Sequence, residues 1–232
     1  MALRLSEVEP ASYEFVCTPT GNEPPEFESH LCRLEEMFQE KIVRLAPYVG
    51  DGLVQLIHEQ GMIPNFRSRF CTRKLKIEPT VSFLKDSSPC VHYVGLRADE
   101  PEREGIYGAM EGVTQRYPLR EWNWGLEDVV GYLDSKGITI PETNCEWCFF
   151  KRLGQWKQLW KKRPESYEEA AKIEREMGHT FRSPQRDTWP AGLDELSEEF
   201  ASGRKVPGYT TDRQLQLFDN CDMNDMCRVC SM

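Results

Sequence analysis

The chain has 232 residues, of which 39% are hydrophobic and 29% are charged, and its net charge at pH 7 is −9. This length and composition are typical of a globular protein with one sizeable domain, alone or with an appendage. No run of about 18 apolar residues and no secretory leader is present, which argues against a membrane protein and favours a cytoplasmic one. The acidic balance argues against a general nucleic-acid coat but permits local basic patches.

The first part of the chain alternates between helical and extended patterns. Residues 1–9 are expected to form the last turns of a helix that Pro10 ends. The apolar run 13–17 predicts a short strand, and the breakers in 18–26 predict a loop. Apolar residues at helical spacing predict a helix over 27–38.

A basic segment follows the next expected helix. That helix covers 53–60, with Gly61 as its stop. The segment 67–76 has five basic residues and no acidic residue, and a further helix is expected around Leu75 and Phe83. The basic residues are Arg67, Arg69, Arg73, Lys74 and Lys76.

Two arginines come just after a strand-like run. The run 91–95 predicts a buried strand, and Arg97 and Arg103 follow its carboxyl end. Ligands bind at the carboxyl ends of parallel strands in open α/β sheets, and guanidinium groups bind phosphate or sulfate in a bidentate way. Arg97 and Arg103 are therefore candidate anion ligands, with Arg73 and Lys76 opposite them. The alternative is ion pairing with neighbouring acids.

The second half of the chain is expected to be mainly helical. Residues 104–116 read as a polar loop, and apolar spacing predicts a helix over 126–133. The segment Ser166–Glu169 has the pattern of a capping box and predicts the start of a helix that ends near Gly178. A further short helix is expected over 193–200.

Nine cysteines are present, and two pairs have metal-ligand spacing. Cys145 and Cys148 are separated by two residues, as are Cys227 and Cys230. Without a secretory leader, ligation of a metal or a cluster explains this pattern better than a disulfide framework. Zinc, an Fe–S cluster and ordinary buried or surface thiols all remain compatible with the spacing.

Several blocks occur in an order that resembles a known family. They are Arg69-x-Cys71-Thr-x-x-Leu-Lys76, Gly95-Leu-Arg97-Ala-Asp-Glu100-x-x-Arg103, Tyr117-Pro118-Leu119 and Cys145-x-x-Cys148. Together they resemble the phosphoadenosine phosphosulfate (PAPS) reductase-like family of PP-loop adenine-nucleotide α-hydrolases. The resemblance implies a three-layer α/β sandwich with a mostly parallel sheet in residues 1–160. A helical, cysteine-containing appendage would follow in residues 161–232.

One defining element of that family is not found in this sequence. In the family, the loop at Thr20, Gly21 and Asn22 follows the second strand and lies on the nucleotide side of the pocket. A Ser-Gly-Gly-Lys-Asp-Ser-like phosphate loop precedes it there, and no such loop occurs here. The chain thus resembles a family member without its first strand and PP-loop. We expect a homo-oligomer, or a partner that supplies the strand.

The resemblance also assigns roles to the cysteines. The implied ligands of a [4Fe–4S] cluster are Cys71, Cys145, Cys148 and, as one open choice for a fourth, Cys221. Zinc is the alternative metal, and another tail cysteine or none could be the fourth ligand. In some reductases of the family a C-terminal cysteine attacks the sulfonyl sulfur, which makes Cys227 and Cys230 the candidate catalytic residues. They could also form a zinc site or be surface thiols.

Three functions agree with these patterns. The first is a PAPS reductase-like oxidoreductase of sulfur metabolism that acts on an adenylylated or sulfonucleotide substrate, with a thioredoxin-like reductant. The second is sulfur insertion into nucleic acid, in which the basic segment 151–163 contacts phosphates. The third is a non-catalytic, metal-stabilised remnant that binds a partner. The tryptophans are explained better by packing than by base stacking: these are Trp122, Trp124, Trp147, Trp156 and Trp160.

Overall fold

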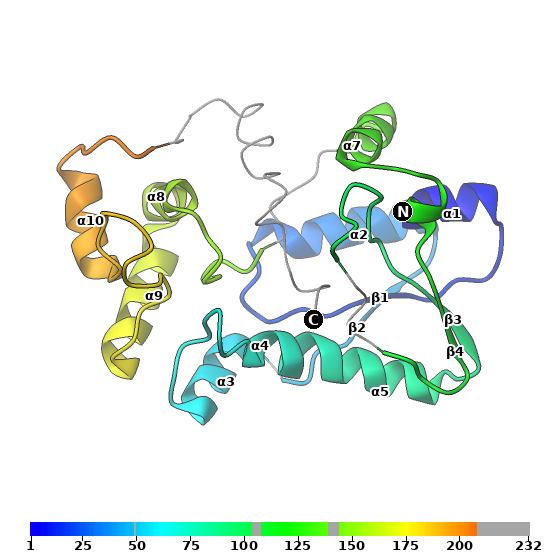
Figure 1. Cartoon of the computed structure of the whole chain (residues 1–232), viewed down its shortest axis with the longest axis horizontal. Helices are drawn as coiled ribbons and strands as arrows, with labels where there is room; N and C mark the ends of the chain where they lie inside the picture. The colour runs from blue at the N-terminus through cyan, green and yellow to red at the C-terminus, as the bar shows by residue number, and fades with distance from the viewer. Residues whose placement is uncertain (49, 104–107, 139–143, 208–232) are drawn as a thin grey trace.

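In the part of the chain that the structure describes, short strands combine with helices up to β4, and only helices follow (Figure 1). The computed structural model describes residues 1–48, 50–103, 108–138 and 144–207. The strands are β1 (Phe15–Cys17), β2 (Ile42–Arg44), β3 (Cys90–Tyr93) and β4 (Val113–Arg116). The helices before β4 are α1 (Ala2–Val8), α2 (Glu26–Phe38), α3 (Gly52–Gln60), α4 (Phe70–Thr72), the π-helical η1 (Arg73–Ile77) and α5 (Glu78–Asp86). The helices after β4 are α6 (Pro118–Glu121), α7 (Leu126–Ser135), α8 (Leu153–Lys162), α9 (Pro164–Met177) and α10 (Leu193–Ala201).

The strands pair in parallel, as expected for an α/β chain. β1 pairs with β2, Phe15 lying opposite Ile42, and β3 pairs with β4, Cys90 lying opposite Val113. A parallel pair needs a crossover connection, and α2 supplies it between β1 and β2. Within the described residues the strands form two separate two-stranded sheets. The α/β class is therefore confirmed at this coarse level.

Most expected helices are present, and their ends follow local rules. α3 ends at Gly61 and α9 at Gly178, both of which adopt the left-handed conformation at the C-cap. The capping-box prediction at Ser166 is wrong. The cap of α9 is Arg163, and Pro164 occupies the first position of the helix, where its missing N–H costs no hydrogen bond.

Two predictions about strands need correction. The segment expected as a polar loop contains β4, whose polar sequence lacks an apolar run but whose backbone pairs with β3. The strand β3 was expected to be buried, yet Val91 is 46% exposed. Successive side chains of a strand point to opposite faces, and Val91 lies on a face of β3 that is open to solvent, so apolar residues alone did not determine burial.

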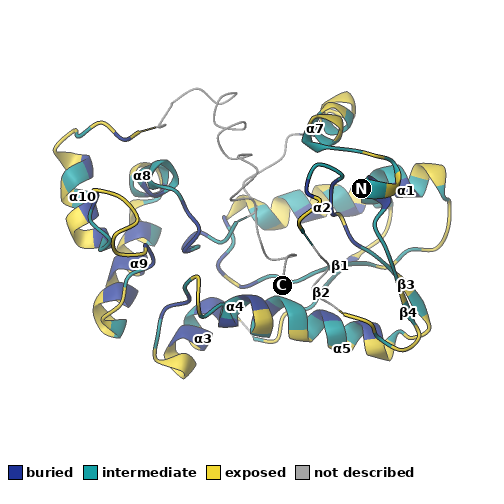
Figure 2. Ribbon diagram, viewed as in Figure 1, coloured by how far each residue is buried: buried dark blue, intermediate teal, exposed yellow. Residues whose placement is uncertain are grey.

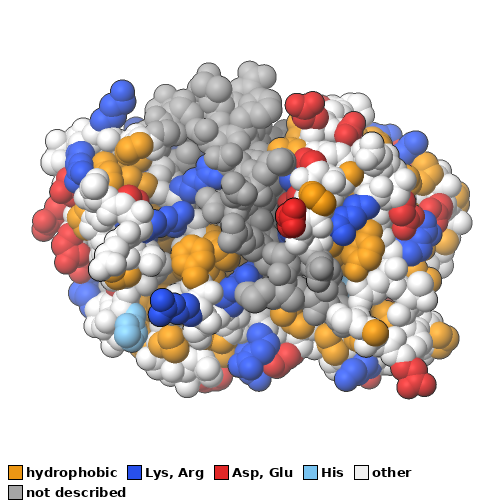
Figure 3. Space-filling model, in the orientation of Figure 1, with side chains coloured by type: hydrophobic (Ala, Val, Ile, Leu, Met, Phe, Trp, Pro, Cys, Tyr) orange, Lys and Arg blue, Asp and Glu red, His pale blue; other side chains and the backbone are white. Residues whose placement is uncertain are grey.

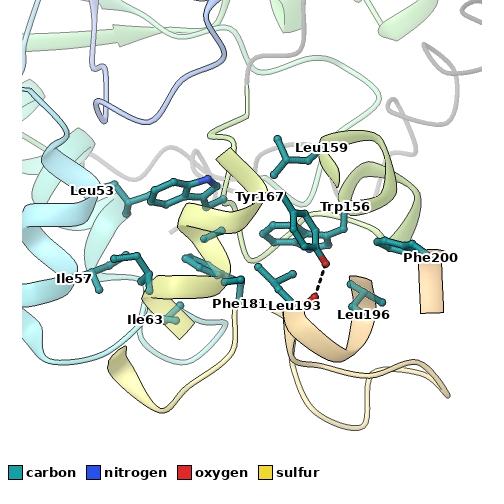
Figure 4. Close-up of a cluster of buried hydrophobic side chains, with 14 of the residues drawn as sticks. Leu53, Ile57, Ile63, Trp156, Leu159, Tyr167, Phe181, Leu193, Leu196 and Phe200 are labelled. Carbon is teal, nitrogen blue, oxygen red and sulfur yellow. Dashed lines mark hydrogen bonds between the residues drawn. The ribbon is translucent and has the colours of Figure 1, made fainter. Parts of the chain in front are cut away.

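A hydrophobic core lies between α3 and the C-terminal helices (Figures 2 and 4). Trp156 of α8 is fully buried, with its ring 5.9 Å from Phe181 and 6.3 Å from Tyr167. The Tyr167 hydroxyl donates a 2.8 Å hydrogen bond to the Leu193 carbonyl, which joins α9 to α10. Trp147 and Trp156 thus pack in the interior, in agreement with the packing interpretation.

This core includes residues on both sides of position 160. Leu53 and Ile57 of α3 belong to the same buried cluster as Leu193 and Phe200 of α10. The C-terminal helices therefore share a core with part of the α/β region. Among the described residues, no helix is both long and apolar enough to cross a membrane.

Candidate functional site

The loop after β1 is held in one conformation by a glycine. Gly21 has a φ of +82°, which side-chain-bearing residues rarely adopt. A Cβ atom at this position would lie 2.3 Å from the carbonyl oxygen of Gly50. The Leu53 N–H donates a 2.8 Å hydrogen bond to the Thr20 carbonyl. The loop therefore approaches the start of α3 so closely that only glycine fits at position 21.

The carboxylate of Glu23 folds back onto the same loop. Its Oε1 accepts hydrogen bonds from the Thr20 backbone N–H at 2.6 Å and from the Thr20 hydroxyl at 2.7 Å. Its Oε2 accepts one from the Gly21 N–H at 2.9 Å. Successive backbone N–H groups that converge on one anionic group form an anion-binding concavity. In this chain Glu23 itself fills that concavity.

A cavity of about 430 Å³ opens beside this loop. It lies beyond the carboxyl ends of β1 and β2, and Thr20 and Gly21 form one of its walls. Phe27, Tyr48 and several prolines add apolar surface. The volume falls in the range of small-molecule sites, roughly 300–1,000 Å³, and the position is the edge of a parallel sheet where ligands bind. The predicted nucleotide loop thus lines a cavity of suitable size.

Among the described residues, the cavity wall has two acidic residues, Glu23 and Glu28, and one basic residue, Arg44. Arg44 lines the cavity and lies 3.0 Å from Glu28, and it also pairs with Glu35. Hydrogen bonds from Arg44, from the Ile42 N–H and from Lys41 hold the pKa of Glu35 at about 2. The Arg44 guanidinium is therefore bound to carboxylates of the chain itself.

A second pocket, much smaller, also has Thr20 in its wall and contains cysteines from two distant segments. Cys71 comes from α4, Cys145 and Cys148 come from the loop before α8, and Lys76 lines the same pocket. The apolar remainder of the wall comes from Leu53, Pro64, Trp147, Phe149 and Phe150. Three of the four cysteines predicted as metal ligands are thus brought together. Cys221, Cys227 and Cys230 lie outside the described residues.

Burial dominates the chemistry of these thiols. It raises the pKa of Cys71 to about 11, an effect that Cys145 increases and Lys76 opposes. It raises the pKa of Cys148 to about 12, and Cys145 and Cys71 add to the rise. Both thiols are therefore protonated at neutral pH, and a bound cation would be needed to stabilise their thiolates.

The donor set of this pocket suits a soft metal. Thiolates select zinc and Fe–S clusters, and their binding releases the thiol protons. Among the described residues, no three Cys, His, Asp or Glu side chains already stand in metal-binding geometry. The pocket therefore supplies three thiols in an apolar setting, and loading would have to draw the sulfur atoms together.

A π-helical segment carries the basic residues next to Cys71. η1 interrupts an otherwise continuous helix from α4 to α5, and such segments are frequent at functional sites. Lys76 of η1 lines the cysteine pocket. Arg73 has a side chain that is 61% exposed and lies 3.8 Å from Glu78. Of these two predicted anion ligands, only Lys76 thus faces the cysteines.

The loop after β1 contacts the Cys-x-x-Cys motif at three points. The Thr20 Oγ1 lies 3.2 Å from the Cys145 Sγ. The Glu146 N–H donates to the Asn22 carbonyl at 2.8 Å, and the Trp147 N–H donates to the Asn22 Oδ1 at 3.1 Å. The predicted nucleotide loop and the predicted metal motif are therefore one structural unit.

The charged side chains of the loop after β3 form ion pairs with one another. The Arg97 Nε lies 2.8 Å from Asp99, and the Arg97 Nη2 lies 3.4 Å from Glu100. Arg103 pairs with the same Glu100 oxygen at 2.5 Å. The side chains of Arg97 and Glu100 are only 6% and 4% exposed. Arg97 and Arg103 thus make the ion pairs considered as the alternative, and their role as anion ligands stays a prediction.

Sequence reasoning missed the residue that clamps this loop. Arg120 of α6 donates hydrogen bonds to the carbonyl oxygens of Arg97 at 3.3 Å, Glu100 at 2.7 Å and Arg103 at 2.5 Å. The signal in the sequence that could have identified Arg120 is its position directly after the Tyr117-Pro118-Leu119 block.

Sequence reasoning also missed the residues that hold the Cys145-x-x-Cys148 motif in place through an ion pair and hydrogen bonds. Glu146, between the two cysteines, is 7% exposed and lies 2.8 Å from the Arg163 Nε. The Ser166 hydroxyl donates to Glu146 and accepts a 2.9 Å hydrogen bond from the Trp147 Nε1. These partners are too far from the motif in sequence to be paired with it by spacing.

Comparison with known proteins identifies no relative of this chain. No protein-family model matches the chain, and neither the curated proteins nor the solved structures include a match. A functional conclusion must therefore be drawn from the site and from the motif residues.

Proposed function

We propose that the chain is a PAPS reductase-like protein of the cytoplasm that acts in sulfur metabolism on an adenylylated or sulfonucleotide substrate. The observation that supports this most strongly is that Thr20 lines both the large cavity and the cysteine pocket. A substrate in the large cavity would be separated from the thiols by a single residue. Nucleotide binding and sulfur chemistry need such adjacent compartments.

The large cavity is the proposed nucleotide site. Phe27 and Tyr48 offer apolar surface for an adenine, and the loop with Thr20 and Gly21 offers backbone and hydroxyl groups. Isothermal titration with AMP tests this assignment. We expect Gly52→Leu to weaken AMP binding, because its side chain would enter the space that Tyr48 and the Thr20 carbonyl border.

The cysteine pocket is the proposed cluster site. Cys71, Cys145 and Cys148 would hold a [4Fe–4S] cluster, with zinc as the alternative, and Lys76 would offset part of the negative charge of the thiolates. When bound, the cluster would supply an iron position open to a sulfur species. The three cysteines would bind it, and the apolar wall would exclude water, while Thr20 contacts Cys145.

The reductive step would be carried out by thiols. A thiolate, with Cys227 and Cys230 as candidates, would attack the sulfonyl sulfur, form a sulfur–sulfur bond and release the adenine nucleotide. A thiol of a thioredoxin-like partner would then attack the cysteine sulfur of that bond and release sulfite. Its second thiol would resolve the mixed disulfide, so the partner dithiol ends as a disulfide and is the electron donor.

The two sheets are proposed to be parts of one mostly parallel sheet in a three-layer sandwich. The Tyr13 ring, just before β1, lies 5.7 Å from the Tyr93 ring of β3. Glu9 lies 2.7 Å from Arg116 of β4. A strand from a second copy or from a partner would join β1 to β3 and protect their edges. Light scattering over a range of concentrations tests this, and a monomer at every concentration argues against the second copy.

The decisive experiment is anaerobic purification followed by metal and sulfide analysis. We expect iron and sulfide in the wild-type protein and neither in the Cys145→Ser/Cys148→Ser variant. Cys32→Ser, on the exposed face of α2, is the control. Stoichiometric zinc without iron after anaerobic reconstitution would contradict the cluster. Sulfite release from PAPS tests the reductase.

A second candidate, sulfur insertion into nucleic acid, is favoured by one exposed ring beside the cysteine pocket. Phe66 is 45% exposed and packs edge-on against Phe149 at 5.4 Å and Phe150 at 5.0 Å, two residues that line that pocket. Arg67 next to it is also exposed. Figure 3 shows Lys and Arg side chains among hydrophobic ones on the half of the visible face that holds α8–α10. Weaker binding of single-stranded RNA by Phe66→Ala, with a thiolated nucleoside as product, would favour this candidate.

A further inference from the structure

Among the described residues, the wall of the large cavity has one basic side chain, which comes from the carboxyl end of a parallel strand. This side chain is Arg44, the last residue of β2, and it is 29% exposed. We propose that Arg44 binds the phosphate group of the nucleotide, and that the carboxylate of Glu28 gives way to that phosphate. The inference rests on the proposed function in one respect, since it takes this cavity as the nucleotide site.

One side of the Arg44 guanidinium is oriented by a buried carboxylate. Its Nη1 pairs with Glu35, whose side chain is 7% exposed, and donates a 2.6 Å hydrogen bond to the Ile42 carbonyl. Glu35 is held in turn by the Ile42 N–H and by the Lys41 ammonium, each at 3.0 Å. Because breaking a buried ion pair is strongly unfavourable, this side of the guanidinium stays fixed when a ligand binds.

The other side of the guanidinium has a partner that a ligand can replace. The Arg44 Nη2 lies 3.0 Å from Glu28, whose side chain is 62% exposed and lines the same cavity. An exposed ion pair contributes little to stability, because water solvates the separated charges nearly as well. A phosphate offers several oxygens to the planar guanidinium and forms charge-assisted hydrogen bonds with it. It can therefore take the place of Glu28, whose carboxylate then turns to solvent.

The other anion positions in the two loops would require more bonds to break. The Glu23 carboxylate accepts three hydrogen bonds of 2.6, 2.7 and 2.9 Å from the loop after β1. The arginines of the loop after β3 pair with Glu100, whose side chain is 4% exposed. An anion would have to displace Glu23 from all three donors, or leave the buried Glu100 without a partner. Exchange at Arg44 disturbs one exposed ion pair only.

Isothermal titration with AMP and with adenosine tests the assignment, because the two ligands differ only in the 5′-phosphate. Arg44→Gln should weaken AMP binding about tenfold or more and leave adenosine binding unchanged, as expected for a lost charge-assisted contact. Arg44→Lys keeps a charge beside Glu35 and should recover part of the AMP affinity. An unchanged AMP affinity in Arg44→Gln, or an equal loss for AMP and adenosine, overturns the assignment.

The role of Glu28 has its own prediction in the same titrations. Glu28→Gln should strengthen AMP binding about two- to fivefold, because the phosphate no longer competes with a carboxylate for Arg44. Glu26→Gln is the matched control, since Glu26 is also exposed on the first turn of α2 but pairs with Arg163 instead. An equal effect of the two variants on AMP binding overturns the exchange with Glu28.

A second arm needs no nucleoside and separates this inference from the proposed function. Inorganic pyrophosphate, added at constant ionic strength, should raise the urea midpoint of wild type and of Glu28→Gln but not that of Arg44→Gln. If neither AMP nor adenosine binds wild type, the nucleotide site is wrong, and this arm still decides whether Arg44 binds an anion. Pyrophosphate that stabilises all three proteins equally, or none of them, overturns the assignment.

Discussion

Two loops follow strands of parallel sheets in this chain, and they differ in how their polar groups are used. The loop after β1 has one carboxylate, Glu23, and lines a cavity of about 430 Å³. The loop after β3 has Arg97, Asp99, Glu100 and Arg103 and neutralises them internally. Sequence reasoning assigned ligand binding to the loop after β3 from its place at the end of a strand, and to the loop after β1 from the family resemblance.

The difference shows that position at a strand end is not sufficient for a ligand site. Buried charges are tolerated when they are paired, so a loop rich in both signs tends to satisfy itself. A loop with few charges and a glycine leaves backbone groups near open space. In this chain the loop after β1 borders the cavity, whereas the charged side chains of the loop after β3 pair with one another. Four predictions test this contrast.

Arg97→Ala is expected to have the largest effect on stability. It leaves Glu100 with Arg103 as its remaining ion-pair partner in a setting where the glutamate side chain is 4% exposed. Breaking a buried pair typically costs about 3–5 kcal/mol of unfolding free energy. Urea denaturation measures this cost. Arg73→Ala, at an exposed position of η1, is the control and should change stability by less than about 0.5 kcal/mol.

The opposite outcome for Arg97 would revive its role as an anion ligand. If Arg97→Ala leaves the urea midpoint unchanged but abolishes AMP binding, the two loops share one function and the contrast fails.

Gly21→Ala is expected to be the next largest change. The new Cβ would meet the Gly50 oxygen at 2.3 Å, and the residue would also be held at positive φ. We expect a loss of about 2–3 kcal/mol. Gly50→Ala separates the two causes, because Gly50 also has a positive φ but has no atom within 4 Å of the added Cβ. Equal losses in both variants would show that the close approach contributes nothing.

Asn22→Ala should cost about 1–2 kcal/mol, because it leaves the buried Trp147 N–H without its acceptor. The same change should increase proteolysis or hydrogen exchange in the cysteine motif, which measures the link between the loop and the motif. Ser197→Ala, which removes the hydrogen bond of an exposed side chain of α10, provides the control. If only global stability falls and exchange in residues 144–150 is unaltered, the loop does not hold the motif.

The smallest expected effects concern pH. Burial raises the pKa of Asp51, which caps α3 beside the first loop. For Asp99 burial acts in the same direction, but hydrogen bonds from Arg97 and from the Leu126 N–H lower its pKa overall. Asp99 therefore contributes stability that is lost as pH falls through its lowered pKa. The raised pKa of Asp51 has the opposite effect: stability falls as the pH rises from the pKa of Asp51 in the unfolded state toward its higher pKa in the folded state.

Urea denaturation of the two Asn variants at several pH values between about 3 and 7 tests these signs. The cost of Asp99→Asn should grow toward neutral pH, and that of Asp51→Asn should shrink, each by about 1 kcal/mol or less. A pH-independent cost in both variants would mean that the two carboxyl groups do not differ in environment.

The sequence by itself determined the local elements of this protein. Apolar spacing located α2, α3, α7 and α10, and Gly61 and Gly178 marked helix ends, because these signals depend on neighbours within a few residues. The strands β1 and β3 followed from short apolar runs. The spacing of Cys145 and Cys148 also singled out the motif that lines the cysteine pocket.

Only the tertiary structure decided what those elements do together. β4 forms because the backbone of a polar segment pairs with the backbone of β3. Ser166 does not cap a helix, and its hydroxyl donates a hydrogen bond to Glu146 of the cysteine motif. Whether Arg97 meets an acid or a ligand depends on burial, which spacing does not encode. The contact between Thr20 and Cys145 joins residues 125 positions apart, and such a contact is fixed by the packing of the chain as a whole.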